Sequence, residues 1–266
     1  MIEKFTTYCR YVKDYIKFNE YYFLFISFQY VVCKKTTKKD RIYKSTLGTF
    51  LSRKGSLDFQ FANYGYEWNV KSFILNNYNR YTVFLDIGAN IGTYSFLLAS
   101  KGLRCFAFEP VDDNYQAMKV NISLNNMDDK IVAFPYGLGS ENRKEHFIFD
   151  PLNTGASHRT LYETEEYCRN HHWKMIFGEI KLLDDVSSDL KINKDDRILI
   201  KIDTEGMELS VVGGARDFLS QHTDYLIIME TIHSDIHKIK TFFSSIGDFD
   251  YQMIDEKNIA IQKVIG

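Results

Sequence analysis

The sequence predicts an α/β fold: a mostly parallel sheet of seven strands with an antiparallel hairpin at its C-terminal end, preceded by an N-terminal extension. From residue 82 onward, short apolar runs alternate with stretches of helical pattern. This alternation is typical of a parallel sheet covered by helices on both faces. A glycine-containing turn follows the first run, and an acidic residue ends the second. We therefore divide the chain into an extension, 1–80, and a main domain, 81–266.

The first half of the main domain is predicted to contain three strands separated by two helices. Each apolar run is too short for a helix and is rich in β-branched or aromatic residues, which favours a strand. The expected order is strand 82–87, helix 91–100, strand 104–108, helix from 112 to about 126, and strand 131–135.

The second half continues the alternation after an interruption. Strands are expected at 198–203 and 225–229, each followed by a helix, and a closing hairpin is expected from 251–254 and 259–264. Residues 137–196 break the rhythm, with strand-like pieces at 146–149 and 175–182. An insertion of this size over the sheet edge is a natural substrate-binding element.

The extension combines a basic segment with short strands. Residues 1–41 carry nine Lys or Arg against four Asp or Glu. The apolar stretch Tyr21–Cys33 has 13 residues, fewer than the roughly 20 of a membrane-spanning helix. Two alternatives remain: a helix packed on the body or on a second subunit of an oligomer, or an aromatic and basic segment lying on an anionic membrane face. Strands are expected at 42–46, 49–53 and 57–62, and a helix at 66–77.

Composition argues against several classes of protein. The net charge of −2 lacks the basic excess of a general nucleic-acid binder. The four cysteines show no CxxC spacing, which argues against a zinc knuckle or disulfide framework and suits a reducing cytosol. We therefore expect a cytoplasmic protein without a nucleic-acid partner, and a peripheral contact with the inner membrane face stays open for residues 1–41.

The turn after the first strand is suited to a charged ligand. Gly88 can adopt backbone angles denied to other residues and lets a ligand approach the main chain. The helix that follows presents unpaired N–H groups and a partial positive charge, which suits a carboxylate. Asp86, at the strand end, can meet an ammonium group. The candidate cofactor-binding residues of this turn are Asp86, Gly88, Ala89, Asn90, Gly92 and Thr93.

Glu109 ends the second strand, 23 residues after Asp86. An acid at this position can accept hydrogen bonds from both hydroxyls of a ribose, and Pro110 is assigned to the same site. A turn alone would explain an Asp-Gly pair, and a helix cap would explain a lone Glu. Their occurrence together at two strand ends favours a nucleoside-containing cofactor. The spacing G-x-x-x-G, rather than G-x-G-x-x-G, disfavours a nicotinamide dehydrogenase.

Four segments together resemble the FkbM family of methyltransferases. They are DIGANIGTYSFLLA at 86–99, FAFEP at 106–110, LDDV at 183–186 and IKIDTEGMELSVVGGA at 200–215, and the resemblance extends over about residues 48–235. The resemblance implies a Rossmann-like class I methyltransferase fold with S-adenosylmethionine as cofactor. It also implies transfer of the methyl group to a hydroxyl of a sugar, glycan or related metabolite. The basic N-terminal segment is not part of the family pattern.

Four polar side chains near strand ends are candidates for the base that such a transfer needs, since a hydroxyl is a poor nucleophile until a base takes its proton. Asp203 and Glu205 rank first, and Glu230 and His233 follow the next strand. Simpler roles are a helix cap for Asp203, a complement to the helix dipole for Glu205 and an ordinary polar residue for His233. No dedicated metal site is predicted, although the acids could hold a divalent cation that lowers the pKa of the hydroxyl.

Four further residues are candidate contacts to the acceptor. Asn153 and His158 lie in a polar stretch of the insertion, for which a solvated turn is the alternative. Arg53 and Glu67 precede the glycine turn and could face the cofactor cleft.

Two other functions stay open: an N-methyltransferase acting on a nucleobase or small molecule, and a cofactor-binding module without turnover. Amine methylation usually uses an Asn/Asp-Pro-Pro-aromatic tetrapeptide where this chain has Asp203-Thr-Glu-Gly206, which weighs against the first. Asp86 and Glu109 are both present, which weighs against the second.

Overall fold

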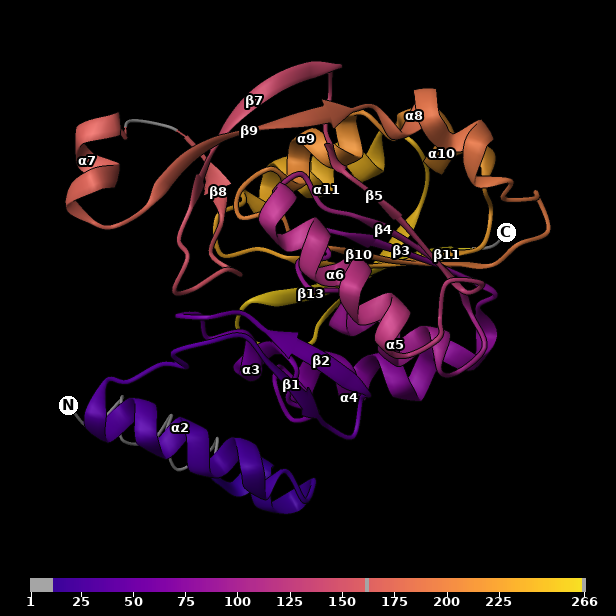
Figure 1. Cartoon of the computed structure of the whole chain (residues 1–266). Coiled ribbons are helices and arrows are strands. Elements are labelled where there is room, and N and C mark those ends of the chain that lie inside the picture. Colours follow the sequence, from indigo (N-terminus) through magenta and orange to yellow (C-terminus); the bar gives the residue numbers. More distant parts are fainter. Residues whose placement is uncertain (1–11, 161–162, 265–266) are drawn as a thin grey trace.

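The computed structural model describes residues 12–160 and 163–264 (Figure 1), and its centre is a sheet of seven strands. These are β3 (Val83–Ile87), β4 (Arg104–Phe108), β5 (Ile131–Phe134), β10 (Ile198–Ile202), β11 (Tyr225–Glu230), β12 (Phe249–Met253) and β13 (Asn258–Lys263). Their order is β12-β13-β11-β10-β3-β4-β5. Neighbours from β11 to β5 are parallel, whereas β13 is antiparallel to both β11 and β12. The predicted sheet and its C-terminal hairpin are confirmed.

Helices and hydrophobic cores cover both faces of this sheet. All residues of β3 and β10 are buried, as expected for parallel strands between two layers. One core contains α5 (Thr93–Ala99), α6 (Asp112–Leu124) and the N-terminal extension. The other contains α8 (Leu183–Val186), the short helix η2 (Ser187–Leu190), α9 (Glu208–Gly213), α10 (Arg216–Gln221) and α11 (Ile236–Ser244).

The strand order reverses between β3 and β10. After β3 the chain continues to β4 on one side of the sheet, and it later returns to β10 on the other. Ligands of open α/β sheets bind at the carboxyl ends of the strands beside such a switch point. The helix expected from residue 91 begins later, at Thr93, because Asn90 (φ 51°) and Gly92 (φ 88°) have left-handed backbone angles. The turn before α5 is therefore longer than predicted.

The segment 137–196 contributes most of a second sheet, which projects beyond the central one (Figure 1). Its order is β6-β9-β7-β8, from β6 (Tyr136–Leu138), β7 (Arg143–Phe149), β8 (His158–Arg159) and β9 (Lys174–Lys181). Helix α7 (Glu165–Asn170) lies at its far end.

The extension packs on the same core as α5 and α6. Its elements are a helical stretch at 12–17, α2 (Tyr21–Cys33), β1 (Arg41–Lys44), β2 (Thr49–Ser52), α3 (Asp58–Phe61), α4 (Trp68–Asn77) and the short helix η1 (Tyr78–Arg80). Expectations for residues 1–11 lie outside the described residues. In the part of the chain that the structure describes, every helix is too short or too polar to cross a membrane.

The strand expected at 57–62 is wrong, because Asp58–Phe61 forms the short helix α3. The alternation Leu57-Asp-Phe-Gln-Phe61 has the period of a strand. Asp58, however, is buried and bonded to Arg53 through both carboxylate oxygens, and its N–H donates to Ser56 Oγ. This local network turns the chain into a helix where the pattern alone favours extension.

Asn121 of α6 and Asn125, which caps the C-terminal end of α6, join the extension to the main domain. The N–H of Leu51 donates to Asn121 Oδ1 over 2.7 Å, and the N–H of Thr49 donates to Asn125 Oδ1 over 2.8 Å. Asn125 Nδ2 also donates to the Thr49 carbonyl. The backbone groups at the free edge of β2 are thus hydrogen-bonded to side chains at the C-terminal end of α6.

Candidate active site

The glycine turn after β3 is held in contact with the loop after β10. Gly88 has φ 84°, and a Cβ placed on it would lie 1.8 Å from the carbonyl oxygen of Asp203. The N–H groups of Gly88 and Ala89 both donate to the carbonyl of Phe108, at the end of β4. Gly88 therefore serves the close approach of two backbone segments, besides the access to a ligand expected from the sequence.

Asp86 lies at the end of β3 and is buried. Its Oδ2 accepts hydrogen bonds from the N–H and Oγ of Ser95, over 3.0 and 2.7 Å, in the first turn of α5. Burial raises the pKa of Asp86, although the charge of Lys201 opposes the shift. Asp86 also lines the larger cavity described below. Its proposed contact with an ammonium group remains a prediction.

Glu109 faces the glycine turn from the end of β4. Its Oε2 accepts from the N–H of Asn90 over 2.8 Å, and its Oε1 accepts from the N–H of Val111 over 3.0 Å. Burial raises the pKa of Glu109 to about 7, and these two N–H donors oppose the shift. Gly88, Glu109 and Pro110 line one small cavity. The two halves of the predicted cofactor site therefore lie on the same side of the molecule.

A larger cavity of about 740 Å³ adjoins the small one. The two share Gly88, Asn90, Gly155, Asp203 and Glu205 in their linings, and we call them together the cleft. The candidate residues Asp86, Ala89 and Thr93 line its larger part, whereas Gly92 lines neither cavity. A Cβ on Gly92 would lie 3.0 Å from Met118 of α6, so this glycine serves the packing of the turn.

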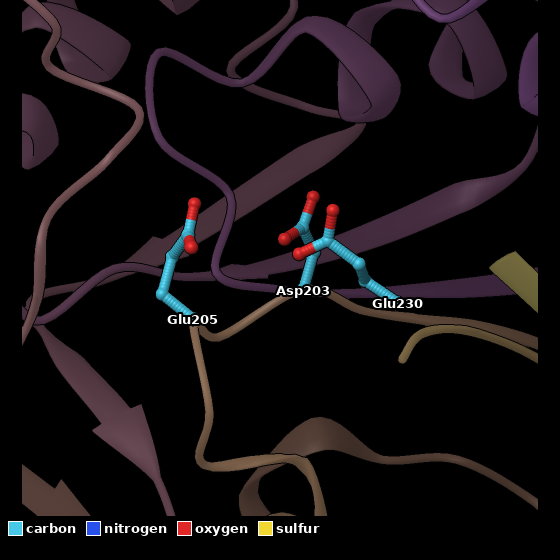
Figure 2. A group of neighbouring side chains, drawn as sticks. All are labelled: Asp203, Glu205 and Glu230. Carbon is cyan, nitrogen blue, oxygen red and sulfur yellow. The ribbon is translucent and has the colours of Figure 1, made fainter. Parts of the chain in front are cut away.

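Three carboxylates gather where β10 and β11 end at the cleft. Oxygen atoms of Asp203, Glu205 and Glu230 lie within 4.8 Å of one another, and Figure 2 shows the three side chains directed toward the same space. Burial, followed by the charge of Asp203, raises the pKa of Glu205 to about 7 and that of Glu230 to about 8. Such a group can take up a proton near neutral pH, and its spacing would also suit one shared cation. His233 lies at the exposed edge, with Nε2 3.5 Å from Glu205 Oε2.

Lys201 is a site residue that the sequence analysis did not identify. It is buried in β10, and its Nζ lies 2.6 Å from Asp203 Oδ2 and 4.6 Å from the ring centre of Tyr94. Burial alone would lower the pKa of Lys201, but the charges of Asp203, Glu67 and Asp86 outweigh it and raise the pKa above its ordinary value. The available signal was a lysine within Ile-Leu-Ile-Lys-Ile, because a buried lysine requires a partner.

Glu208 is a second site residue that was not predicted from the sequence. It holds the loop after β10 in place. Its Oε1 accepts from the N–H and Oγ1 of Thr204 and from the N–H of Gly206, over 3.0–3.1 Å. Its Oε2 accepts from Ser234 Oγ. Glu208 is buried. The motif Asp-Thr-Glu-Gly-Met-Glu therefore contains two carboxylates that line the cleft, Asp203 and Glu205, and a third, Glu208, that holds their loop in place.

The four candidate acceptor contacts separate in the structure. Glu67 and Asn153 line the cleft, and Tyr94 Oη donates to Glu67 Oε2 over 2.7 Å. His158 lies outside the cleft lining, with Nε2 3.4 Å from Glu163. Arg53 is also outside it, which corrects the expectation for this residue.

The guanidinium of Arg53 is occupied by structural contacts. It pairs with Asp58 over 2.8 Å and donates to the Asp113 carbonyl and to Asn114 Oδ1. Burial would raise the pKa of Asp58, but hydrogen bonds and the charge of Arg53 hold it below its ordinary value. Thr154 Oγ1 donates to the same carboxylate. Arg53 therefore positions α3 and the adjacent cleft wall.

The fold and the cleft together define the class of this protein. A seven-stranded sheet with a glycine turn after β3 and an acid at the end of β4, both facing one cleft, is the arrangement of the Rossmann-like class I S-adenosylmethionine-dependent methyltransferases. The family model of the methyltransferase FkbM domain matches residues 86–253, more than half of the chain. The chain belongs to the FkbM methyltransferase family, as the resemblance indicated.

Three relatives illustrate the likeness and its extent. Hexuronic acid methyltransferase AglP of Haloferax volcanii is 26% identical over 64% of this chain and 64% of its own length. Methyltransferase 1 of Beauveria bassiana is 28% identical over 61% of this chain and 70% of its own. The crystal structure of methyltransferase FkbM from Methylobacillus flagellatus KT has a TM-score of 0.46 and 20% identity, over 68% of this chain and 43% of that one. This chain thus spans less than two thirds of the length of the archaeal relative and of that structure.

Proposed function

We propose that this chain transfers the methyl group of S-adenosylmethionine to a hydroxyl of a sugar or glycan. The observation that carries the proposal is the cluster of three carboxylates, Asp203, Glu205 and Glu230. The cluster lies beside the glycine turn, on the wall of a cleft large enough for cofactor and acceptor. A cleft lined by carboxylates suits a sulfonium, which is a cation. The same carboxylates provide bases next to the transferable methyl group.

The chemistry is a direct displacement at the methyl carbon. The acceptor oxygen attacks from the side opposite the sulfur, at about 3–3.5 Å in a reactive geometry. The new oxygen–carbon bond forms as the carbon–sulfur bond breaks, and a carboxylate takes the hydroxyl proton. Efficient general bases have pKa values near the working pH. Glu205 and Glu230, at about 7 and 8, meet that condition.

Two further observations support a hydroxyl acceptor. The loop after β10 reads Asp203-Thr-Glu-Gly206 and lacks the Pro-Pro-aromatic sequence expected of an amine methyltransferase. The archaeal relative is named for methylation of a hexuronic acid, which is a sugar derivative. A divalent cation shared by the three carboxylates would lower the pKa of a bound hydroxyl.

The test measures cofactor binding and methyl transfer separately. Calorimetry should detect S-adenosylmethionine binding by the wild-type chain, and radiolabelled methyl groups should then pass to at least one member of a panel of neutral, amino and acidic sugars. Glu205→Gln and Glu230→Gln should reduce transfer while retaining cofactor binding. Asp128→Asn, at an exposed site after α6, is the control for charge removal and should leave both unchanged.

The other outcomes are equally informative. Transfer only to nucleobases or amines would replace the proposal by N-methylation. Tight cofactor binding without transfer to any sugar, nucleobase or amine would indicate an inactive binding module. Loss of transfer after treatment with EDTA, restored by Mg²⁺ or Mn²⁺, would assign a cation to the carboxylate group, and unchanged transfer would exclude that role.

A further inference from the structure

Helix α2 carries an apolar face that the described fold does not use. Tyr21, Phe25, Phe28 and Val32 follow one another at the spacing of a single helical stripe. Their exposed fractions are 58%, 57%, 63% and 60%. Figure 1 shows α2 at the margin of the molecule, with the other labelled elements to one side of it. A contiguous stripe of large exposed apolar side chains on a surface helix marks an interaction site.

The opposite face of α2 already anchors the helix to the protein. Phe23 and Ile26 are buried, and the ring of Phe23 packs against Tyr43 of β1 with centroids 6.0 Å apart. The two faces together explain why the whole segment is apolar. Because burial of one face is enough to dock the helix, the aromatic character of the other needs a separate reason.

A run of positive charge follows the exposed stripe directly. Lys34, Lys35, Lys38, Lys39 and Arg41 are all exposed, and Asp40 is the only acid among residues 34–44. The charge of the remaining chain has the opposite sign, since residues 45–266 contain 23 Lys or Arg against 31 Asp or Glu. A partner that matches this surface offers anionic groups to the basic segment and an apolar layer to the exposed stripe of α2.

We propose that α2 and the basic segment 34–41 form a docking surface for an anionic phospholipid membrane. Tyr and Phe side chains are stable at the depth of the headgroups, and a helix of 13 residues would lie in the plane of the interface instead of crossing it. Lys and Arg next to such a helix are attracted by anionic lipids, each contributing roughly fivefold to the affinity. The exposed stripe of α2 and the positive charges of segment 34–41 would therefore both contact the same membrane.

The residues directly before α2 pack against the wall of the cleft. Phe18, between the helical stretch 12–17 and α2, packs against Trp68 with ring centroids 4.4 Å apart. Trp68 and Asp14 line the larger cavity of the cleft. Membrane docking through α2 would consequently fix the orientation of the cleft relative to the lipid surface. The proposal does not depend on which acceptor the cleft takes.

Vesicle co-sedimentation of the full chain tests the proposal. Wild-type protein should bind vesicles of phosphatidylcholine with phosphatidylglycerol, more weakly at high salt, and should not bind phosphatidylcholine alone. Phe25→Ser/Phe28→Ser should lower binding by roughly tenfold or more. Lys34→Glu/Lys35→Glu should lower it by roughly fivefold or more for each lysine and reduce its salt dependence.

Matched controls lie on other elements of the chain. Phe177→Ser removes an equally exposed aromatic side chain from β9, and Lys101→Glu/Lys130→Glu makes the same change of charge away from α2. Both should bind vesicles as the wild type does. Calorimetry with S-adenosylmethionine, unchanged in every variant, shows that the fold is retained and separates a failure of docking from a failure of the proposed function.

Two results would overturn the proposal. One is a wild-type chain that does not bind anionic vesicles, or binding by Phe25→Ser/Phe28→Ser and by Lys34→Glu/Lys35→Glu that equals binding by the wild type. The other is a wild-type dimer in light scattering that becomes monomeric on Phe25→Ser/Phe28→Ser without any vesicle binding. That second result would identify the stripe as a contact between two copies of the chain.

Discussion

Gly88→Ala offers a direct test of how the cleft is assembled. The added Cβ would lie 1.8 Å from the Asp203 carbonyl oxygen and 2.9 Å from its carbonyl carbon. Non-bonded heavy atoms rest roughly 3.5–4.0 Å apart. The turn after β3 and the loop after β10 must therefore move apart by roughly 1 Å or more. Neither contact atom belongs to a flexible side chain, so the backbone itself must shift.

Two effects contribute, and they can be separated. Placing alanine at φ 84° costs about 1–3 kcal/mol of strain. A displacement of about 1 Å in groups that position a substrate can lower a reaction rate by about 100-fold, and we expect a loss of cofactor affinity of the same order. Gly102→Ala is the control, because Gly102 also has a positive φ of 96° but no atom lies within 4 Å of its added Cβ. It should show the strain alone.

Calorimetry with S-adenosylmethionine and urea unfolding monitored by circular dichroism measure the two effects. Both variants should lose stability, and only Gly88→Ala should lose cofactor affinity. If Gly88→Ala bound the cofactor as tightly as Gly102→Ala, the contact between the two loops would not shape the cofactor site, and the reasoning would be refuted.

The remaining predictions concern buried and half-buried charged side chains. Arg53→Met should lower the free energy of unfolding by about 3–5 kcal/mol, because Asp58 stays buried without its cation; urea titration checks this, and Arg53→Met/Asp58→Asn should regain most of the loss. Methyl transfer should increase with pH through roughly 7–8, since Glu205 and Glu230 accept a proton only when ionised; a flat profile of kcat/KM against pH would exclude both as the base. Glu208→Gln should weaken cofactor binding by about tenfold, or about 1.4 kcal/mol, because its loop loses a charged acceptor; calorimetry showing wild-type affinity would contradict this.

The parallel strands at the centre of the sheet were predictable because each is a short, mostly apolar run that fits a buried strand. The five residues of β3, like the five of β10, are all buried, and buried parallel strands give that pattern. The helix α3 was not predictable in this way. Its sequence alternates like a strand, and the ion pair of Asp58 with Arg53, five residues away, decides the conformation.

The candidate site was predictable where side chains follow strands. Asp86, Glu109, Asp203 and Glu230 all lie at the carboxyl ends of parallel strands, so topology alone brings them to one edge. Arg53 could not be placed, because its partners come from α3 and α6 and depend on packing between distant segments.

Glu109 has a consequence for thermodynamics. With a pKa of about 7, Glu109 is partly protonated and partly ionised in a neutral solution. A ribose that donated its hydroxyls to this group would favour the carboxylate, and uptake of the cofactor would then expel a proton into the solvent. The heat of binding would vary with the ionisation enthalpy of the buffer, and affinity would grow as the medium became more alkaline.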